Sequence, residues 1–300
     1  GPSPTRPPRL ARRPESPLPA PPPPSVRRLD QDLQRVVEHA LGDEADHYGV
    51  VVLRLTDGRT AQLNAGRVFY AASLFKLPVM VEVFRQVAAG TLSMDEALVV
   101  TESAAEYDLG TLAHEVGEAV TVGRLLEEMI TYSDNVAAIM LLGRVAPAAI
   151  DETLASLGLD HTSVLTEDIP TTAGDMGRLF ELLGRGQLVD HDASEAMLAL
   201  MRRQGINDRI PQGVPDGVAV AHKTGNWDDA THDTGVVFAS HGAYVLVVLS
   251  DLAWENEGII GLSRAVYRYF EGIPPGAAPA APMPAATTAG PASTTRATSR

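Results

Sequence analysis

Strand-like segments lie near both ends of this 300-residue chain, and the stretch between them has helical periodicity. The valine-rich segment HYGVVVLRL at 47–55 predicts a strand, and the turn at Asp57-Gly58 predicts its hairpin partner at 61–66. Valine-rich segments at 217–225 and 234–251 predict further strands. Apolar residues at helical spacing predict helices at 29–41, 73–88, 122–131, 136–145, 147–157, 173–183, 194–203 and 259–270. We therefore expect an α+β fold in which an antiparallel sheet, built from both chain ends and flanked by helices, carries an inserted all-helical subdomain.

The two ends of the chain differ in composition from its middle. Residues 1–28 hold 11 of the 22 prolines, and residues 273–300 hold six more among alanine, threonine, glycine and serine. Segments of this kind bury too little apolar surface to offset the entropy of an ordered chain. We predict a disordered proline-rich linker at 1–28, one folded domain at 29–272 and a disordered tail rich in Ala, Pro and Thr at 273–300.

The predicted folded domain is strongly acidic. Residues 29–272 contain 16 basic and 37 acidic residues, a formal net charge of −21. This charge repels phosphate backbones and anionic membrane surfaces, so we expect no nucleic-acid partner and no peripheral membrane binding. The absence of cysteine excludes disulfides, thiolate catalysis and cysteine-based zinc sites. His114-Glu115 lacks the second histidine of a zinc-protease motif, so we expect no metal and no cofactor.

The cellular location is an expectation from composition alone. No run of 18 apolar residues is present, and the chain begins Gly1-Pro2-Ser3 without a signal-peptide core. Two interpretations stay open: a leader or anchor has been removed, or Gly1-Pro2 is a cloning remnant. A proline-rich spacer suits a tethered protein. We expect an extracytoplasmic monomer, secreted or tethered to a membrane through a removed N-terminal segment.

The stretch ASLFKLPV at 72–79 carries Lys76, one of only two lysines beside 22 arginines. Ser73 and Lys76 are three residues apart on a predicted helix, which places them on one face, about 5–6 Å apart at Cβ. A serine nucleophile needs a neighbour that takes its proton; lysine can become such a base, whereas arginine stays charged. A serine at a helix start also lies near free backbone N–H groups that stabilise an oxyanion. Ser73 and Lys76 are therefore candidates for a nucleophile and its base.

The second lysine and a polar triplet complete a set of three motifs. Lys223 lies in HKTG at 222–225 on a predicted edge strand, and Ser133-Asp134-Asn135 lies between two predicted helices. The order S-x-x-K, S-D-N, K-T-G is that of class A β-lactamases and penicillin-binding proteins. Over roughly residues 29–272 the chain resembles this family of penicillin-recognising serine hydrolases. The resemblance implies a β-lactamase/transpeptidase-like fold.

The resemblance also implies catalytic roles. Ser73 would be the acylated nucleophile, and Lys76 would help to deprotonate it. Ser133 would relay a proton to the leaving nitrogen, supported by Lys223, which would also meet the substrate carboxylate. Asp134 would orient its loop.

Five positions are implied in substrate binding. Asn135 would hold the acyl-amide of the substrate and touch Lys76. Thr224 would meet the substrate carboxylate together with Lys223, and Gly225 would be a further substrate-binding residue. The backbone N–H of Asn226, with that of the nucleophile, would form the oxyanion hole. Tyr107 would line the mouth of the cleft. The implied substrate is a small-molecule β-lactam or a peptidoglycan-like compound.

The chain departs from class A β-lactamases between the second and third motifs. Members of that class carry a glutamate and an asparagine there, which position the water that hydrolyses the acyl-enzyme. In this chain the corresponding stretch TSVLTEDIP at 162–170 is short and lacks E-x-x-L-N. Glu167 is the nearest carboxylate by type, with Asp168 beside it, and Thr171 takes the place of the asparagine. Glu167 as a solvated loop acid is the open alternative.

A second departure concerns the substrate carboxylate. Many members carry an arginine on the strand after K-T-G, whereas this chain reads THDTG at 231–235. His232 and Arg209 are the candidates to replace it, and a structural role for His232 stays open.

Together these features predict a serine hydrolase of the class A β-lactamase type, acylated at Ser73 by β-lactams or related amides and esters. Three alternatives for deacylation stay open. Hydrolysis of the acyl-enzyme is slow, it uses Glu167 or Asp168 as a base, or the acyl group passes to an acceptor other than water. One alternative is a D-alanyl-D-alanine peptidase or esterase. Another is a non-catalytic receptor that stays acylated by β-lactams.

Overall fold

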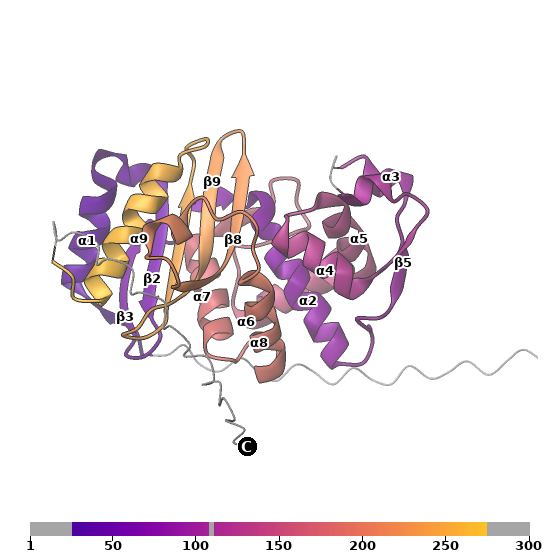
Figure 1. Ribbon diagram of the computed structural model, residues 1–300, viewed down its shortest axis with the longest axis horizontal. Coiled ribbons are helices and arrows are strands. Elements are labelled where there is room, and N and C mark those ends of the chain that lie inside the picture. The colour runs from indigo at the N-terminus through magenta and orange to yellow at the C-terminus, as the bar shows by residue number, and fades with distance from the viewer. Residues whose placement is uncertain (1–25, 108–110, 275–300) are drawn as a thin grey trace, which may run out of the picture.

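The computed structural model describes residues 26–107 and 111–274, and its largest element is a six-stranded sheet (Figure 1). The strand order is β1-β3-β2-β10-β9-β8, and the bounds are β1 (Arg28–Leu29), β2 (Tyr48–Arg54), β3 (Arg59–Leu63), β8 (Ala219–Trp227), β9 (Ala230–Phe238) and β10 (Tyr244–Ser250). All neighbours pair antiparallel except β1 and β3. Three strands precede the helical region and three follow it, which confirms the predicted assembly from both chain ends.

Alternate residues of the central strand β2 face two separate hydrophobic layers. Val51 and Leu53 pack into one layer, and Val50 and Val52 pack into the other. Helices α1 (Gln31–Leu41) and α9 (Asn256–Phe270) cover the face of Val50, and α7 (Ala173–Gly184) lies against the face of Val51 (Figure 1). Because side chains alternate along a strand, burial of both faces explains the continuous valine run.

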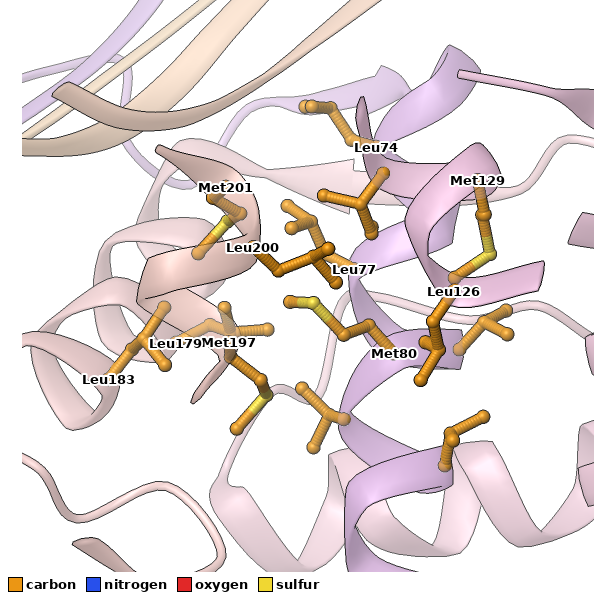
Figure 2. Packing of buried hydrophobic residues seen from close by; sticks show 14 of the residues in the cluster. Leu74, Leu77, Met80, Leu126, Met129, Leu179, Leu183, Met197, Leu200 and Met201 are labelled. Atoms are coloured by element: carbon orange, nitrogen blue, oxygen red, sulfur yellow. The ribbon is translucent and has the colours of Figure 1, made fainter. Parts of the chain in front are cut away.

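The hydrophobic layer on the Val51 face continues into a helical subdomain. This subdomain contains α2 (Lys76–Ala88), α4 (Val122–Thr131), α5 (Asn135–Val145), α6 (Pro147–Leu157) and α8 (His191–Met201). Figure 2 shows Leu77 and Met80 of α2 between Leu126 of α4 and Met197 of α8. Helix α2 therefore runs through the core of the subdomain, and its first turn has little freedom to move.

Short elements complete the fold. They are the helix α3 (Glu102–Ala105), the 3-10 helices η1 (Gly42–His47), η2 (Ala72–Phe75), η3 (Thr111–His114) and η4 (Ile210–Gly213), and two pairs of strands, β4 (Val68–Tyr70) with β7 (Pro170–Thr172) and β5 (Ala97–Val99) with β6 (Ala119–Thr121). Three-residue strands are too short to show a period, so the sequence did not predict them.

The predicted element boundaries differ from the structure at several places. The helix expected at 194–203 spans residues 191–201, because the side chain of Asp190 caps its start by accepting a hydrogen bond from the Ala193 amide. The helix expected from Ser73 begins as the 3-10 turn η2 and becomes α-helical at Lys76. The hairpin partner expected at 61–66 is β3, which starts two residues earlier.

Most of the predicted linker and tail lies outside the described residues. The described part begins at Val26, and Arg27 forms an ion pair of 2.7 Å with the buried Glu181 of α7. Within residues 26–107 and 111–274, no helix has the length and apolar character needed to cross a bilayer.

Candidate active site

Ser73 lies in η2, at the point where the chain turns into α2. Ala72 before it has φ +46°, a left-handed conformation that costs a non-glycine residue about 1–2 kcal/mol. The buried side chains of Leu74 and Leu77 anchor the turn in the core. Within the described residues, the hydroxyl of Ser73 has one hydrogen-bond partner, Nζ of Lys76 at 3.1 Å. Packing thus holds a strained turn that aims the hydroxyl of Ser73 at the amine of Lys76.

Lys76 is fully buried, and oxygen atoms surround its Nζ. Besides Ser73 Oγ, these are the Ser133 carbonyl oxygen at 2.5 Å, Asn135 Oδ1 at 2.6 Å and Ser133 Oγ at 3.0 Å. Carbonyl and amide oxygens only accept hydrogen bonds, so they take two N–H groups of Lys76. The remaining position on Nζ faces the two hydroxyls; it is a third N–H in the ammonium and a lone pair in the neutral amine. Lys76 is therefore placed to receive the proton of Ser73.

Ser133 occupies a strained position between the two lysines. Its backbone has φ +61°, and the carboxylate of Asp134 caps α5 by accepting a hydrogen bond of 2.8 Å from the Ala137 amide. This local structure directs both the carbonyl and the hydroxyl of Ser133 at Lys76. Asp134 therefore orients its loop, as the sequence predicted.

Lys223 also contacts the hydroxyl of Ser133, to which Lys76 donates. Its Nζ donates hydrogen bonds to Ser133 Oγ at 3.0 Å and to the Thr224 carbonyl at 3.0 Å. Burial lowers the pKa of Lys223 well below its ordinary value, and the nearby Lys76 and Arg209 lower it further, while Asp233 opposes the shift. The two lysines and Ser133 thus form a continuous hydrogen-bonded path from the nucleophile to the edge strand.

The end of β8 presents backbone groups to the site. Trp227 and Ala230 flank a two-residue hairpin turn and form a hydrogen-bonded pair. Hydrogen-bonded and non-hydrogen-bonded pairs alternate along an antiparallel ladder, so the next pair, Asn226 with Thr231, is non-hydrogen-bonded. The N–H of Asn226 therefore points away from β9. The Thr224 carbonyl, two residues earlier, points the same way, because it accepts from Lys223. Gly225 packs closely on the helix start: a Cβ there would meet the Ala71 carbonyl oxygen at 3.2 Å. This close approach packs the end of β8, with the outward N–H of Asn226, against the turn that carries Ser73.

His232 does not serve as a carboxylate ligand. Its Nε2 donates a hydrogen bond to the Tyr70 carbonyl at 2.8 Å, and its Nδ1 accepts one from the Ser250 amide at 3.1 Å. Burial lowers the pKa of His232 to about 4. The imidazole is therefore neutral, and both of its nitrogens form hydrogen bonds within the protein. These contacts support a structural role for His232.

Arg209 lies behind the edge strand and is also buried. Its guanidinium donates to Asn226 Oδ1 at 2.6 Å, to the His232 carbonyl at 3.1 Å and to Asn256 Oδ1 at 2.8 Å. The side chain of Asn226 thus anchors Arg209, while its backbone N–H points away from β9. Lys76, Lys223 and Arg209 together make this region positive within an acidic protein, which favours an anionic ligand group.

The loop acids lie apart from this network. Glu167 and Asp168 are exposed, and neither forms a hydrogen bond through its side chain or an ion pair with the part of the chain that the structure describes. Thr171 is buried, and its hydroxyl bonds with that of Thr162 at 3.1 Å. Thr171 therefore serves the packing of the loop, and the role of Glu167 stays a prediction.

Exposed aromatic side chains lie around the motif residues. Tyr107 is exposed, and its carbonyl accepts a hydrogen bond of 3.4 Å from Asn135 Nδ2. The sequence analysis did not identify Tyr132, which precedes Ser133, or Trp227, whose ring is tilted against that of Tyr70 at a centroid distance of 5.5 Å. Their positions directly beside motif residues were the signal that could have identified them. Among the described residues, no cluster of three His, Cys, Asp or Glu side chains could hold a metal ion.

Comparisons with known proteins agree with this geometry. A family model described as "Beta-lactamase enzyme family" matches residues 28–270. The extended-spectrum beta-lactamase PER-1 of Pseudomonas aeruginosa is 26% identical over 251 residues, covering 74% of this chain and 82% of PER-1.

Solved structures share the fold. PBP-A superposes with a TM-score of 0.77 at 26% identity, covering 82% of this chain and 98% of PBP-A, and a structure of a PBP-A mutant is an acyl-enzyme complex with penicillin G. A beta-lactamase from Sphaerobacter thermophilus has a TM-score of 0.74 at 26% identity, covering 82% of this chain and 99% of that one.

Proposed function

Because the chain belongs to the beta-lactamase enzyme family, we propose that it acts as a class A-type serine β-lactamase with Ser73 as its acylated nucleophile. The matched residues 28–270 include all three motifs. Relatives named beta-lactamase and the penicillin G acyl-enzyme of a structural neighbour support a hydrolase acting on β-lactams. The residue assignment rests on the surroundings of Lys76 Nζ. This atom lies 3.1 Å from Ser73 Oγ, while two of its N–H groups donate to the Ser133 carbonyl oxygen and to Asn135 Oδ1, which can only accept hydrogen bonds.

Acylation begins at Ser73. Its Oγ attacks the β-lactam carbonyl carbon while its proton passes to Nζ of Lys76, which acts as general base. The carbonyl oxygen becomes an oxyanion, and the backbone N–H groups of Ser73 and Asn226 stabilise it. The packing of Gly225 on the helix start supports this pairing of donors.

Ring opening requires a proton on the leaving nitrogen. The C–N bond breaks as Ser133 Oγ gives its proton to that nitrogen, and Lys76 returns the proton taken from Ser73 to Ser133. Both lysines lie 3.0 Å from Ser133 Oγ, so the path needs no rearrangement of the protein. The result is an acyl ester at Ser73 and a ring-opened amine.

The substrate carboxylate binds at the edge strand. Lys223 and Thr224 supply this site, and an anionic group there offsets the mutual repulsion of Lys223, Lys76 and Arg209. Asn135 holds the acyl-amide: Lys76 fixes its Oδ1, and its Nδ2 donates a hydrogen bond of 3.4 Å to the Tyr107 carbonyl on the entrance side. Tyr107 lines the entrance.

Deacylation is the slow half of the reaction in this proposal. Glu167 is the candidate base for the hydrolytic water, and its exposed position without a partner in the described structure supports weak activation. The same observation favours a second candidate function, a peptidase, esterase or acylated receptor related to penicillin-binding proteins. The structural similarity to PBP-A agrees with this alternative.

The setting of the enzyme is also a proposal. The proline-rich composition of residues 1–28 suits a spacer, so we place the domain outside the cytoplasm as a monomer, secreted or tethered to a membrane. Cell fractionation and light scattering test these two points.

Turnover and adduct lifetime separate the candidate functions. The protein is mixed with a chromogenic cephalosporin, and colour release is followed together with intact mass. Many turnovers per protein with a transient adduct support a β-lactamase. One burst with a lasting adduct supports a receptor or a peptidase-like enzyme, and neither turnover nor adduct contradicts both.

A further inference from the structure

His222 lies on β8 directly before Lys223, and its side chain points to the opposite face of the sheet. Val220, two residues earlier on the same face, packs with Ile210 and with α9. The imidazole is fully buried there. Its Nδ1 lies 2.8 Å from Oδ1 of Asp233 on β9, and its Nε2 lies 3.0 Å from Oδ1 of Asn207. The ring thus joins the strand of the third motif to the loop at 204–213.

The orientation of Asn207 determines which of its atoms faces the ring. Its Nδ2 donates a hydrogen bond of 2.7 Å to the Gln204 carbonyl, so Oδ1 is the atom that faces Nε2 of His222. The carboxylate of Asp233, on the other side, also only accepts hydrogen bonds. Both ring nitrogens therefore face acceptors, and both bonds form only when each nitrogen carries a proton, as in the imidazolium.

The loop held by His222 carries Arg209. Asp233 uses its second oxygen, Oδ2, to accept a hydrogen bond of 3.0 Å from the Ile210 amide. The chain is thus held on both sides of Arg209, at Asn207 and at Ile210. Arg209 in turn donates to Asn226 Oδ1 at 2.6 Å. A short path of contacts links the imidazole to the residue whose backbone N–H faces the nucleophile.

The charges around His222 come from few groups. Asp233 on β9 is buried and contacts the ring, while Arg209 and the half-exposed Asp208 lie on the loop. Lys223 on β8 lies on the other face. The α9 residues that bond to this loop, Asn256 and Ser263, are uncharged. Asp233 is therefore the direct counter-charge of the imidazolium.

We propose that His222 is a positioning residue for acylation, which in its doubly protonated form clamps residues 207–210 against the back of the K-T-G strand and so holds Arg209 on Asn226. The inference rests on the proposed role of Asn226 in the oxyanion hole. When the ring loses one proton, one hydrogen bond breaks and two acceptor atoms face each other. The loop is then held by one contact fewer, the Asn226 N–H loses its alignment, and acylation slows.

The protonation state is measured directly. Nitrogen-15 NMR of the ring nitrogens, assigned by comparison with His222→Gln, reports whether both carry protons in the whole protein. We expect two protonated nitrogens at pH 6, because both face acceptor atoms. A non-protonated ring nitrogen at pH 6 would overturn the inference without any activity measurement.

The functional consequence is measured as the second-order acylation rate constant at pH 6. His222→Gln keeps a single donor group in place of the two ring N–H groups and is expected to lower this rate constant about tenfold. Asn207→Leu removes the acceptor that faces Nε2 and is expected to lower it similarly, whereas Asn207→Asp keeps an acceptor there and is expected to stay within about threefold of the parent. His39→Gln, at an exposed position on α1, is the matched control.

An acylation rate constant that stays at the parent value in both His222→Gln and Asn207→Leu would overturn the inference. A loss in Asn207→Leu that Asn207→Asp does not share supports it even if His222→Gln fails to fold. The proposed function fails differently, through absence of acylation in the parent protein, so the two failures are distinguishable.

Discussion

Nζ of Lys223 lies 3.0 Å from Oγ of Ser133, and Nζ of Lys76 lies 3.0 Å from the same oxygen. These are the only two lysines of the chain, and arginine fills every other basic position apart from histidine. A neutral lysine amine can accept a proton from a hydroxyl and later return it. A guanidinium cannot do this, because it does not deprotonate. The contacts of Lys76 with the hydroxyls of Ser73 and Ser133 therefore explain why lysine and not arginine occupies position 76.

Replacing each lysine by arginine separates proton transfer from charge. Lys76→Arg is expected to lower the acylation rate constant about 10³-fold, because no base then accepts the Ser73 proton. Lys223→Arg retains a positive charge, so we expect a smaller loss, mainly as a higher KM for substrates with a free carboxylate. Stopped-flow acylation with a chromogenic cephalosporin measures both. Equal losses in the two variants would contradict the distinct roles.

Ser133 combines a chemical role with backbone strain. Ser133→Ala and Ser133→Gly both remove the hydroxyl, and we expect each to lower acylation by about 10²-fold or more. Since Ser133 has φ +61°, glycine also relieves strain, and Ser133→Gly should unfold with a free energy about 1 kcal/mol higher than Ser133→Ala. Denaturant unfolding measures this difference. A glycine variant that is active, or less stable than the alanine variant, would count against this account.

Glu167 is tested through the second half of the reaction. Glu167→Gln is expected to leave acylation unchanged and to slow deacylation about 10²-fold, because the hydrolytic water loses its base. Asp168→Asn, at the neighbouring exposed position, is the control and is expected to behave like the parent. The decay of the intact-mass adduct after removal of excess substrate measures both. Unchanged adduct lifetime in Glu167→Gln would remove Glu167 from the mechanism.

His232 makes the stability of the domain depend on pH. Its pKa falls from 6.5 in the unfolded chain to about 4 in the folded one, so between these values the unfolded state binds more protons. Stability is therefore fully present above about pH 6.5 and is lost as the pH falls toward 4, by about 3 kcal/mol for this group. His232→Gln, which keeps one donor and one acceptor, is expected to remove this part of the acid slope. Urea unfolding between pH 4 and 7 measures it, and an identical slope in both proteins would contradict the assignment.

The parts of the fold that sequence reasoning predicted have strong local signals. The valine run of β2 and the spacing of apolar residues in α4 and α6 reflect burial of whole faces, which a periodic pattern encodes directly. The strands β4 and β7 were missed because three residues show no period, and they form only where Val68–Tyr70 meets Pro170–Thr172 across about 100 residues of chain.

The candidate site divides in the same way. Ser73, Lys76, Ser133 and Lys223 were predicted from motif spacing, and the structure brings all four together. The function of His232 could not be deduced from spacing, because its partners, Tyr70 and Ser250, are distant in sequence. The same holds for His222, whose partner Asn207 has no motif to mark it.

The most direct test of the account is to locate the covalent adduct. The parent protein and Ser73→Ala are treated with penicillin G, quenched in acid and digested, and the modified peptide is sequenced by mass spectrometry. We predict one penicilloyl group on Ser73 in the parent and none in Ser73→Ala. An adduct on another residue, or an adduct that persists in Ser73→Ala, would contradict the assignment of Ser73 as the nucleophile.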